Sequence, residues 1–224
     1  MLQPKLTRKE LFEQALAYLK EEYRYAETEL LYETPFELLV SVILSAQCTD
    51  KRVNMTTPAL FERYPDAHAM AAATVEDIFP IIRSISYPNN KAKHLVGMAQ
   101  RLVNEFGGEV PQEVPQLQSL PGVGRKTAHV VTSVLYRQPN MAVDTHVMRV
   151  SNRIGLTTNT ARHNPLLTEQ QLVRHIPIDD IPDAHHWLIL HGRYTCVARK
   201  PKCEQCGLTN ICKYFAQNVR LLLE

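Results

Sequence analysis

The stretch LPGVGRKTAHVVTSVLYRQPNMAVDTH, from Leu120 to His146, decides the fold of this chain. Its Pro-Gly-Val-Gly segment is a tight turn between a short apolar segment and an apolar pattern with helical spacing. Glycine has no Cβ, so the backbone can approach a ligand closely, and the unpaired amides at the start of a helix attract phosphate. The stretch therefore predicts a helix-hairpin-helix at about residues 114–133, whose turn binds a backbone phosphate without reading base sequence.

Lys126 lies in the first turn of the second helix of this hairpin. The partial positive charge at a helix N-terminus disfavours an ammonium there and favours the neutral amine. A neutral amine is a nucleophile suited to Schiff-base chemistry. Lysines at the start of a helix are more commonly surface residues that contact phosphate. From the residues alone, both roles remain open for Lys126.

Asp144 precedes an amphipathic run that ends at Gly155. Asp144 or Thr145 is the natural N-cap of the helix predicted there. Capping alone would account for the aspartate. Its carboxylate is also suited to activating a nucleophile or balancing a developing positive charge, and the two roles are compatible.

The composition of the chain is that of an ordinary globular protein. It has 224 residues, 45% hydrophobic and 21% charged, enough for one large or two small domains. A net charge of +2 permits nucleic-acid binding but does not indicate it. No apolar run approaches the roughly 20 residues of a membrane span, and the first residues contain no apolar signal core. We therefore expect a cytoplasmic protein without disulfides.

Four of the five cysteines form the array C-x6-C-x2-C-x5-C between residues 196 and 212. Four thiolates so close in sequence can bind zinc or an iron–sulfur cluster, and the spacing alone does not decide between them. The first loop of the array contains three basic residues, and no acid occurs from His191 to Lys202. This local basic patch, hidden by the small net charge, suits contact with a phosphate backbone.

Capping boxes begin helices at Thr7 and Thr34, and a third resembles one at Thr74. The second of these helices, about 36–46, is apolar on nearly every side, which predicts a buried helix in a helical bundle. Alternating strand patterns are absent. Further helices are expected at 67–73, 75–85, 90–106, near 169–175 and 185–194.

Two residues in predicted loops, Gln47 and Tyr87, each allow two interpretations. Gln47, after the buried helix, is either an ordinary loop residue or a side chain that reaches into a groove. Tyr87, at a turn before the helix 90–106, either packs in the loop or stacks into DNA as a wedge. Cys48 is interpreted as a small core residue. The histidines of HHWLILH are not favoured as zinc ligands, because the adjacent pair cannot share one helix face.

Several motifs together resemble the endonuclease III family, whose members are DNA glycosylases and abasic-site lyases of the helix-hairpin-helix superfamily. The resemblance covers nearly the whole chain. It depends on SAQCTD at 45–50, LPGVGRKTAHVV at 120–131, AVDTHVMRVSNRIGL at 142–156, HHWLILHGRYTC at 185–196 and the cysteine array. A lone PGVG is a weak signal, whereas this combination is specific.

The resemblance implies an all-α fold of two helical domains with DNA in the cleft between them. A six-helix barrel would span 28–138, and an iron–sulfur cluster domain would combine 1–27 with 139–224. Lys126 corresponds to the family's catalytic nucleophile and Asp144 to its acidic partner. A [4Fe-4S] cluster would be held by Cys196, Cys203, Cys206 and Cys212.

The resemblance also implies base excision repair. The substrate would be an oxidised pyrimidine or an abasic site in duplex DNA, cleaved on the 3′ side by β-elimination through a Lys Schiff base. We expect a monomer that is associated with the nucleoid through DNA. The expected DNA contacts are Gln47, Tyr87, Gly122, Gly124, Arg125, His146, Arg199, Lys200 and Lys202.

The chain departs from the common bacterial pattern at three places. Tyr87 occupies the loop that usually offers a leucine wedge, His129 stands where asparagine is common, and Cys48 replaces a smaller residue. Two related enzymes, the adenine glycosylase and the thymine-mismatch glycosylase, have another residue at the position of Lys126. A non-catalytic DNA-binding scaffold with a structural zinc is the alternative from another class.

Overall fold

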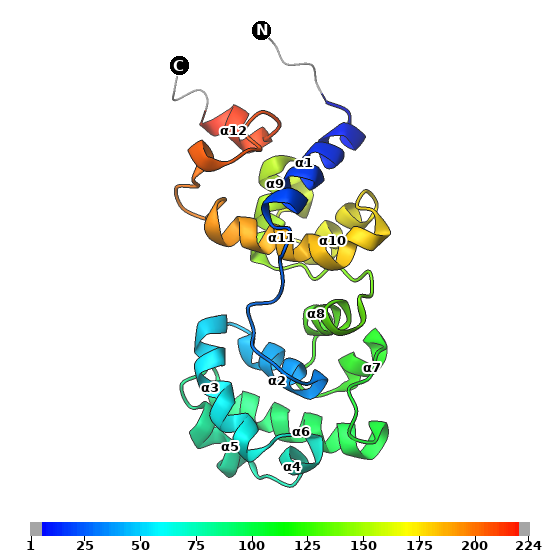
Figure 1. The fold of residues 1–224 in the computed structure, drawn as a ribbon, viewed down its shortest axis with the longest axis vertical. Helices are drawn as coiled ribbons and strands as arrows, with labels where there is room; N and C mark the ends of the chain where they lie inside the picture. Colours follow the sequence, from blue (N-terminus) through cyan, green and yellow to red (C-terminus); the bar gives the residue numbers. More distant parts are fainter. Residues whose placement is uncertain (1–5, 220–224) are drawn as a thin grey trace. The chain divides into compact units, whose positions relative to one another are not determined.

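The computed structural model describes residues 6–219, and within that range it contains helices and no strands. The all-α prediction is therefore confirmed for the described part of the chain. The residues divide into two compact units. The hairpin unit is Thr28–Gln138, and the cysteine unit combines the described residues up to Glu27 with those from Pro139 onward. Figure 1 labels the helices of each unit along the chain. No helix among the described residues is long and apolar enough to cross a membrane.

The hairpin unit is built around α2 (Pro35–Ser45), the helix predicted to be buried. Every residue from Leu38 to Leu44 is buried. The helix packs against α3 (Asp50–Arg63), α6 (Pro88–Phe106) and α8 (Arg125–Tyr136), as Figure 1 shows. Besides the five-residue α4 (Ala67–Ala71), the unit contains six α-helices, completed by α5 (Val75–Ile82) and α7 (Val114–Ser119).

Threonine caps define helix starts in this unit, as predicted from the sequence. The Thr74 box is complete, because the Thr74 hydroxyl accepts from the Asp77 amide and the Asp77 carboxylate accepts from the Thr74 amide. Thr34 also caps its helix through the Glu37 amide. Its box is not reciprocal, since the Glu37 carboxylate accepts from Glu33 instead. The Thr34 motif therefore acts as a single cap and not as the predicted box.

The helix-hairpin-helix is formed by α7, the turn 120–124 and α8. Gly122 has φ +81°, the left-handed conformation that the turn requires. A Cβ added at Gly122 would lie 2.9 Å from the Cβ of His94 on α6, so that helix approaches the turn closely. Leu120 and Val123 are buried in the core of the unit. Packing against the core and against α6 therefore fixes the conformation of the turn.

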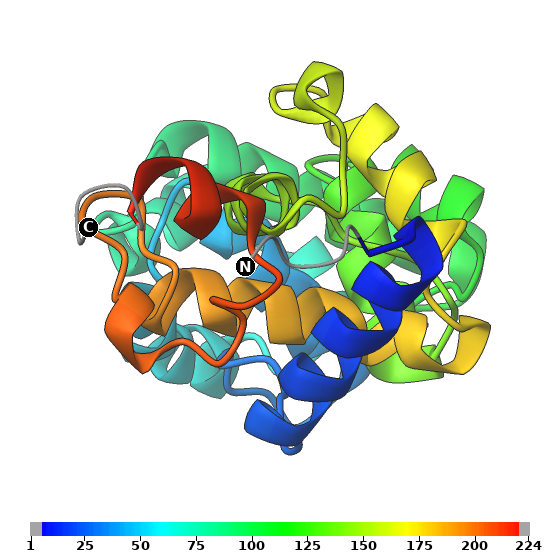
Figure 2. The same ribbon diagram turned by 90° about the horizontal axis from the view of Figure 1, so that it is seen from above.

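The cysteine unit packs α1 (Arg8–Glu22) and α9 (Thr145–Ile154) against α11 (Ile181–Tyr194). Its core contains Phe12 and Leu19 of α1 together with Val150 and Trp187. Figure 2 shows α12 (Lys213–Asn218), in red, and the loops that precede it; α12 packs on α9. The remaining elements are α10 (Pro165–Val173) and three short 3-10 helices, Asn159–Ala161, Ile178–Asp180 and Cys203–Gln205.

Several helix boundaries differ from the sequence-based expectations. Helix α10 begins four residues before the expected 169, because Asn164 caps it and Pro165 takes the first helical position. Helix α11 begins at Ile181, also with a proline near its start. Helices α3 and α12 were not predicted. Thr49 caps α3, and Pro58 lies inside that helix.

Two glycines of the hairpin turn make a matched pair for a stability test. Gly122→Ala places a side chain at positive φ and against His94, and we expect it to lower the free energy of unfolding by about 2 kcal/mol or more. Gly124 has φ −88° and nothing within 4 Å of an added Cβ. Gly124→Ala should therefore cost about 1 kcal/mol or less. Urea unfolding of both variants measures the difference, and equal losses would contradict this account of the turn.

Candidate active site and metal centre

Lys126 is exposed in the first turn of α8, next to the hairpin turn. Helix α8 starts after Gly124, whose lack of a side chain leaves the first-turn amides without a side-chain cap. Positively polarised amides and an amine thus share one end of the helix. This arrangement suits an anionic ligand such as a phosphate, with the amine beside it.

Gln47 and Tyr87 are both exposed residues of the hairpin unit in the left-handed conformation, with φ 55° and 56°. Non-glycine residues occupy that region only at a cost in free energy, unless the surroundings hold them there. Gln47 follows the end of α2, and Tyr87 directly precedes α6 and exposes 63% of its surface. Two exposed side chains on strained backbone therefore lie at helix ends of the same unit.

Of the two residues predicted as possible N-caps, Asp144 and not Thr145 caps α9 in the cysteine unit. Its Oδ1 accepts hydrogen bonds from the amides of His146, at 2.8 Å, and Val147, at 2.9 Å. Its Oδ2 lies 3.0 Å from Nδ1 of the His146 ring. The side chain exposes 15% of its surface, so the carboxylate keeps access to solvent while it caps the helix. Lys126 belongs to the hairpin unit and Asp144 to the cysteine unit.

Two arginines of α9 form hydrogen bonds to the backbone at the start of the basic loop 197–202 and just before it. Arg149 donates to the carbonyls of Gly192, at 2.8 Å, and Cys196, at 3.1 Å. Arg153 donates to the carbonyls of Val197 and Ala198, at 2.8 and 2.9 Å. Because these bonds fix the start of the loop, the next residues project outward. The exposed basic side chains are Arg199, Lys200 and Lys202.

Arg149 and Arg153 were not among the site residues predicted from the sequence. They are four residues apart on α9 and therefore share one face, which is a signal the sequence does contain. What the sequence does not contain is their partners, which are carbonyl groups more than 40 residues further along the chain. Such partners become visible only when α9 packs on α11.

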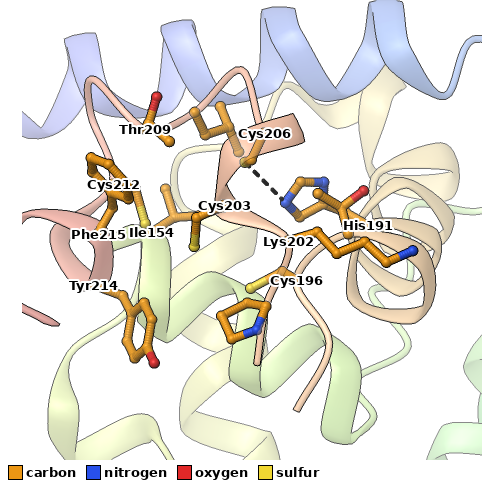
Figure 3. A pocket seen from close by; sticks show the side chains of 13 residues that line it. Ile154, His191, Cys196, Lys202, Cys203, Cys206, Thr209, Cys212, Tyr214 and Phe215 are labelled. Atoms are coloured by element: carbon orange, nitrogen blue, oxygen red, sulfur yellow. Dashed lines mark hydrogen bonds between the residues drawn. The ribbon is translucent and has the colours of Figure 1, made fainter. Parts of the chain in front are cut away.

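Cys196, Cys203, Cys206 and Cys212 line one cavity, shown in Figure 3. They come from the end of α11, the 3-10 helix that follows and the segment before α12. Burial raises the pKa of the Cys206 thiol to about 11 and also raises the pKa of the thiols of Cys203 and Cys212. Buried thiolates therefore need a compensating positive charge, which bound iron supplies. No group of three or more His, Cys, Asp or Glu side chains within residues 6–219 is close enough to hold a single metal ion.

His191 borders the same cavity, and the dashed line in Figure 3 joins its Nε2 to Sγ of Cys206, 3.7 Å away. Its Nδ1 is 3.2 Å from the hydroxyl of Tyr23 on α1. Burial lowers the pKa of His191 to about 4, so the ring is neutral at physiological pH. A neutral ring with a partner on each side is a packing residue of the cavity wall.

The chain matches two family models. Residues 40–177 match the HhH-GPD superfamily of base excision DNA repair proteins. Residues 196–212, which begin and end at cysteines of the array, match the iron-sulfur binding domain of endonuclease III. The chain belongs to the endonuclease III family.

Named relatives are similar in sequence to this chain over nearly its full length. Endonuclease III of Synechocystis is 45% identical over 213 residues, which are 95% of this chain and 96% of that protein. The Escherichia coli K12 endonuclease III is 42% identical over 199 residues, 89% of this chain and 93% of that protein. A solved structure of a trapped covalent endonuclease III–DNA intermediate has a TM-score of 0.88 and 40% identity, covering 95% of this chain and 98% of that one.

Membership of this family establishes the general activity. The chain is a DNA glycosylase and abasic-site lyase of base excision repair that binds DNA and contains a [4Fe-4S] cluster. The predicted family, fold and cofactor are therefore confirmed. A thermostable thymine-DNA glycosylase shares the fold, with a TM-score of 0.79, but at 23% identity it shows the fold alone.

The arginines beneath the basic loop allow a test of cluster retention. Arg153→Met removes the bonds to Val197 and Ala198 and the 3.5 Å contact with Sγ of Cys196, so we expect an iron chelator to bleach the visible absorbance of the cluster about tenfold faster. Arg162→Met removes an exposed arginine of the same unit and should leave the rate unchanged. Equal bleaching of the two variants would show that these bonds do not support the cluster.

Proposed function

We propose that this enzyme releases oxidised pyrimidines from duplex DNA and cleaves the abasic site on its 3′ side through a Schiff base on Lys126. The observation that supports this proposal best is the exposed Lys126 amine in the first turn of α8, a helix start that has no side-chain cap. The amides suit the phosphates that flank a damaged nucleotide. The amine then has an anchored sugar within its reach.

The chemistry begins when the damaged nucleotide leaves the base stack, which costs least for a lesion that stacks badly. The Lys126 nitrogen attacks C1′ of the sugar, and the glycosidic bond breaks with its electron pair going to the base. Asp144 accepts the proton that the amine loses, or balances the positive charge on the sugar. Its carboxylate suits that role because it stays partly exposed while capping α9.

The sugar ring then opens: the C1′–O4′ bond breaks, O4′ takes a proton, and the nitrogen becomes double-bonded to C1′ as a Schiff base. The lyase step follows from this Schiff base. The positive nitrogen at C1′ acidifies the hydrogens on C2′, and loss of one of them breaks the bond between C3′ and its phosphate oxygen. Water later releases the sugar from Lys126 and regenerates the amine. No metal is needed in this sequence, because the protonated imine draws the electrons itself.

We further propose that Cys196, Cys203, Cys206 and Cys212 hold the [4Fe-4S] cluster, since they line one cavity. The bound cluster supplies iron–thiolate bonds that fix the two ends of the basic loop 197–202. The loop then presents its three basic side chains to the DNA backbone. Gln47 fills the gap left by the extruded nucleotide, Tyr87 acts as the wedge, and the hairpin turn with Arg125 and His146 completes the DNA contacts.

Borohydride trapping tests the role of Lys126. The protein is incubated with a duplex that contains one thymine glycol, and borohydride is added to reduce any Schiff base to a stable protein–DNA bond. We expect a covalent band for the wild-type protein and none for Lys126→Arg. Arginine keeps the positive charge but does not form a Schiff base. Binding of Lys126→Arg to a duplex with a non-cleavable abasic analogue should stay within about threefold, since the phosphate contact survives.

Two results would contradict the proposal in different ways. Base release without a trapped band would indicate a monofunctional glycosylase in which Lys126 contacts phosphate. If no oxidised pyrimidine is released but lesions of another class are, the substrate class is wrong and the Schiff base is tested on those lesions instead.

Asp144→Asn separates the two roles of Asp144. Asparagine is an equally good N-cap, so we expect the free energy of unfolding to change by about 0.5 kcal/mol or less. Asparagine is not a base, and single-turnover base release should fall by about 100-fold or more. Asp144→Ala should lose the cap as well, at a further cost of about 1 kcal/mol. Wild-type rates in Asp144→Asn would assign the residue to capping alone.

A further inference from the structure

Lys91 is a buried lysine that the mechanism does not use. It lies in the first turn of α6 and exposes 5% of its surface. Its Nζ donates hydrogen bonds to the carbonyls of Leu44, at 2.7 Å, and Ala46, at 2.6 Å. Burying an ammonium is unfavourable unless it is hydrogen-bonded, and an apolar residue of similar size would fill the same space. The charge therefore has a use other than packing.

The two carbonyls that Lys91 binds lie at the C-terminal end of α2. The last carbonyls of a helix have no partner within the helix, and the negative end of the helix dipole favours a cation there. Helix α2 ends at Ser45, so both bonds fall where the chain leaves the helix. Ala46, the second acceptor, is directly followed by Gln47, whose backbone is in the left-handed conformation. The Lys91 ammonium thus holds the segment that sets the direction of Gln47.

The same residue also holds Tyr87. The backbone amide of Lys91 donates to the Tyr87 carbonyl at 3.1 Å, which is the first hydrogen bond of α6. Tyr87 is also left-handed and exposed, and it has no side-chain cap bond of its own. Lys91 is therefore bonded on one side to the segment before Gln47 and on the other to Tyr87. All of these residues belong to the hairpin unit.

We propose that Lys91 is a positioning residue that couples Gln47 and Tyr87, so that the two side chains enter the duplex as one rigid pair. The inference rests on the proposed function, because it assumes that these side chains probe DNA. Each left-handed backbone needs its surroundings to hold it, and Lys91 supplies a common support to both. Without the ammonium bonds, the segment 46–48 loses its hydrogen-bonded link to α6, and the probes act independently. Lys91 itself does not touch the reacting atoms.

A double-mutant cycle on single-turnover base release tests the coupling. Lys91→Met keeps most of the side-chain volume and removes the ammonium bonds. We expect it to slow release from duplex DNA about tenfold. In a Gln47→Ala/Tyr87→Ala background the same change should slow release by less than about twofold, because its targets are already absent. Cleavage of an abasic site in single-stranded DNA, which needs no probes, should stay within about twofold in Lys91→Met.

Lys93→Met is the matched control, since it removes an exposed amine from the same turn of α6. Any effect of Lys93→Met should be equal in the wild-type and the double-alanine backgrounds. Lys91→Arg is a second variant that keeps the charge and the donors, and it should recover part of the duplex activity lost in Lys91→Met.

Three results would overturn the inference. Equal slowing by Lys91→Met in both backgrounds, or a loss of cleavage on single-stranded DNA as well, would make Lys91 a general structural residue. Failure of both Lys91 variants to fold would assign it to the core. Wild-type protein that releases no base from any oxidised-pyrimidine duplex would remove the proposed function itself, and this is recognised before the variants are compared.

Discussion

The burial of α2 is the constraint on which the hairpin unit depends. A helix that is apolar on nearly every side has to be covered on nearly every side, and α3, α6 and α8 provide the cover. Close-packed interiors resist small shifts. The helices packed around α2 therefore fix the positions of its two ends. Thr34 closes one end, and Lys91 binds the other. The segment that follows α2 and the segments that precede α6 and α8 are therefore positioned by the packing of these helices.

The starts of α8 and α9 each combine a structural role with a role in the proposed chemistry. A helix N-terminus offers amides to an anion, whether a capping carboxylate or a phosphate. At α9 the anion is Asp144 of the chain itself, and at α8 the place is left open by Gly124. The carboxylate and the amine of the proposed chemistry are thus attached to the start of a helix in each unit, where backbone geometry is well defined.

The sequence predicted what depends on local spacing. The threonine caps, the buried α2, the glycine turn and the cysteine array all follow from residues a few positions apart. Helix α3 was missed, because Pro58 interrupts its pattern. The roles of Lys91, Arg149 and Arg153 were not predictable, because each binds backbone carbonyls that lie 43 to 47 residues away in sequence. A carbonyl leaves no trace in the residue types, and only the packed structure shows which one is near.

The cysteine unit is assembled from both ends of the described chain, and this orders its folding during synthesis. Helix α1 is made before α11, yet its buried face, including Leu19, packs on α11, whose Trp187 is made some 170 residues later. At about 5–20 residues per second, that interval is roughly 10–30 s. The hairpin unit is contiguous and is completed in the meantime. Helix α1 therefore waits, with its apolar face unpaired, until α11 has been made.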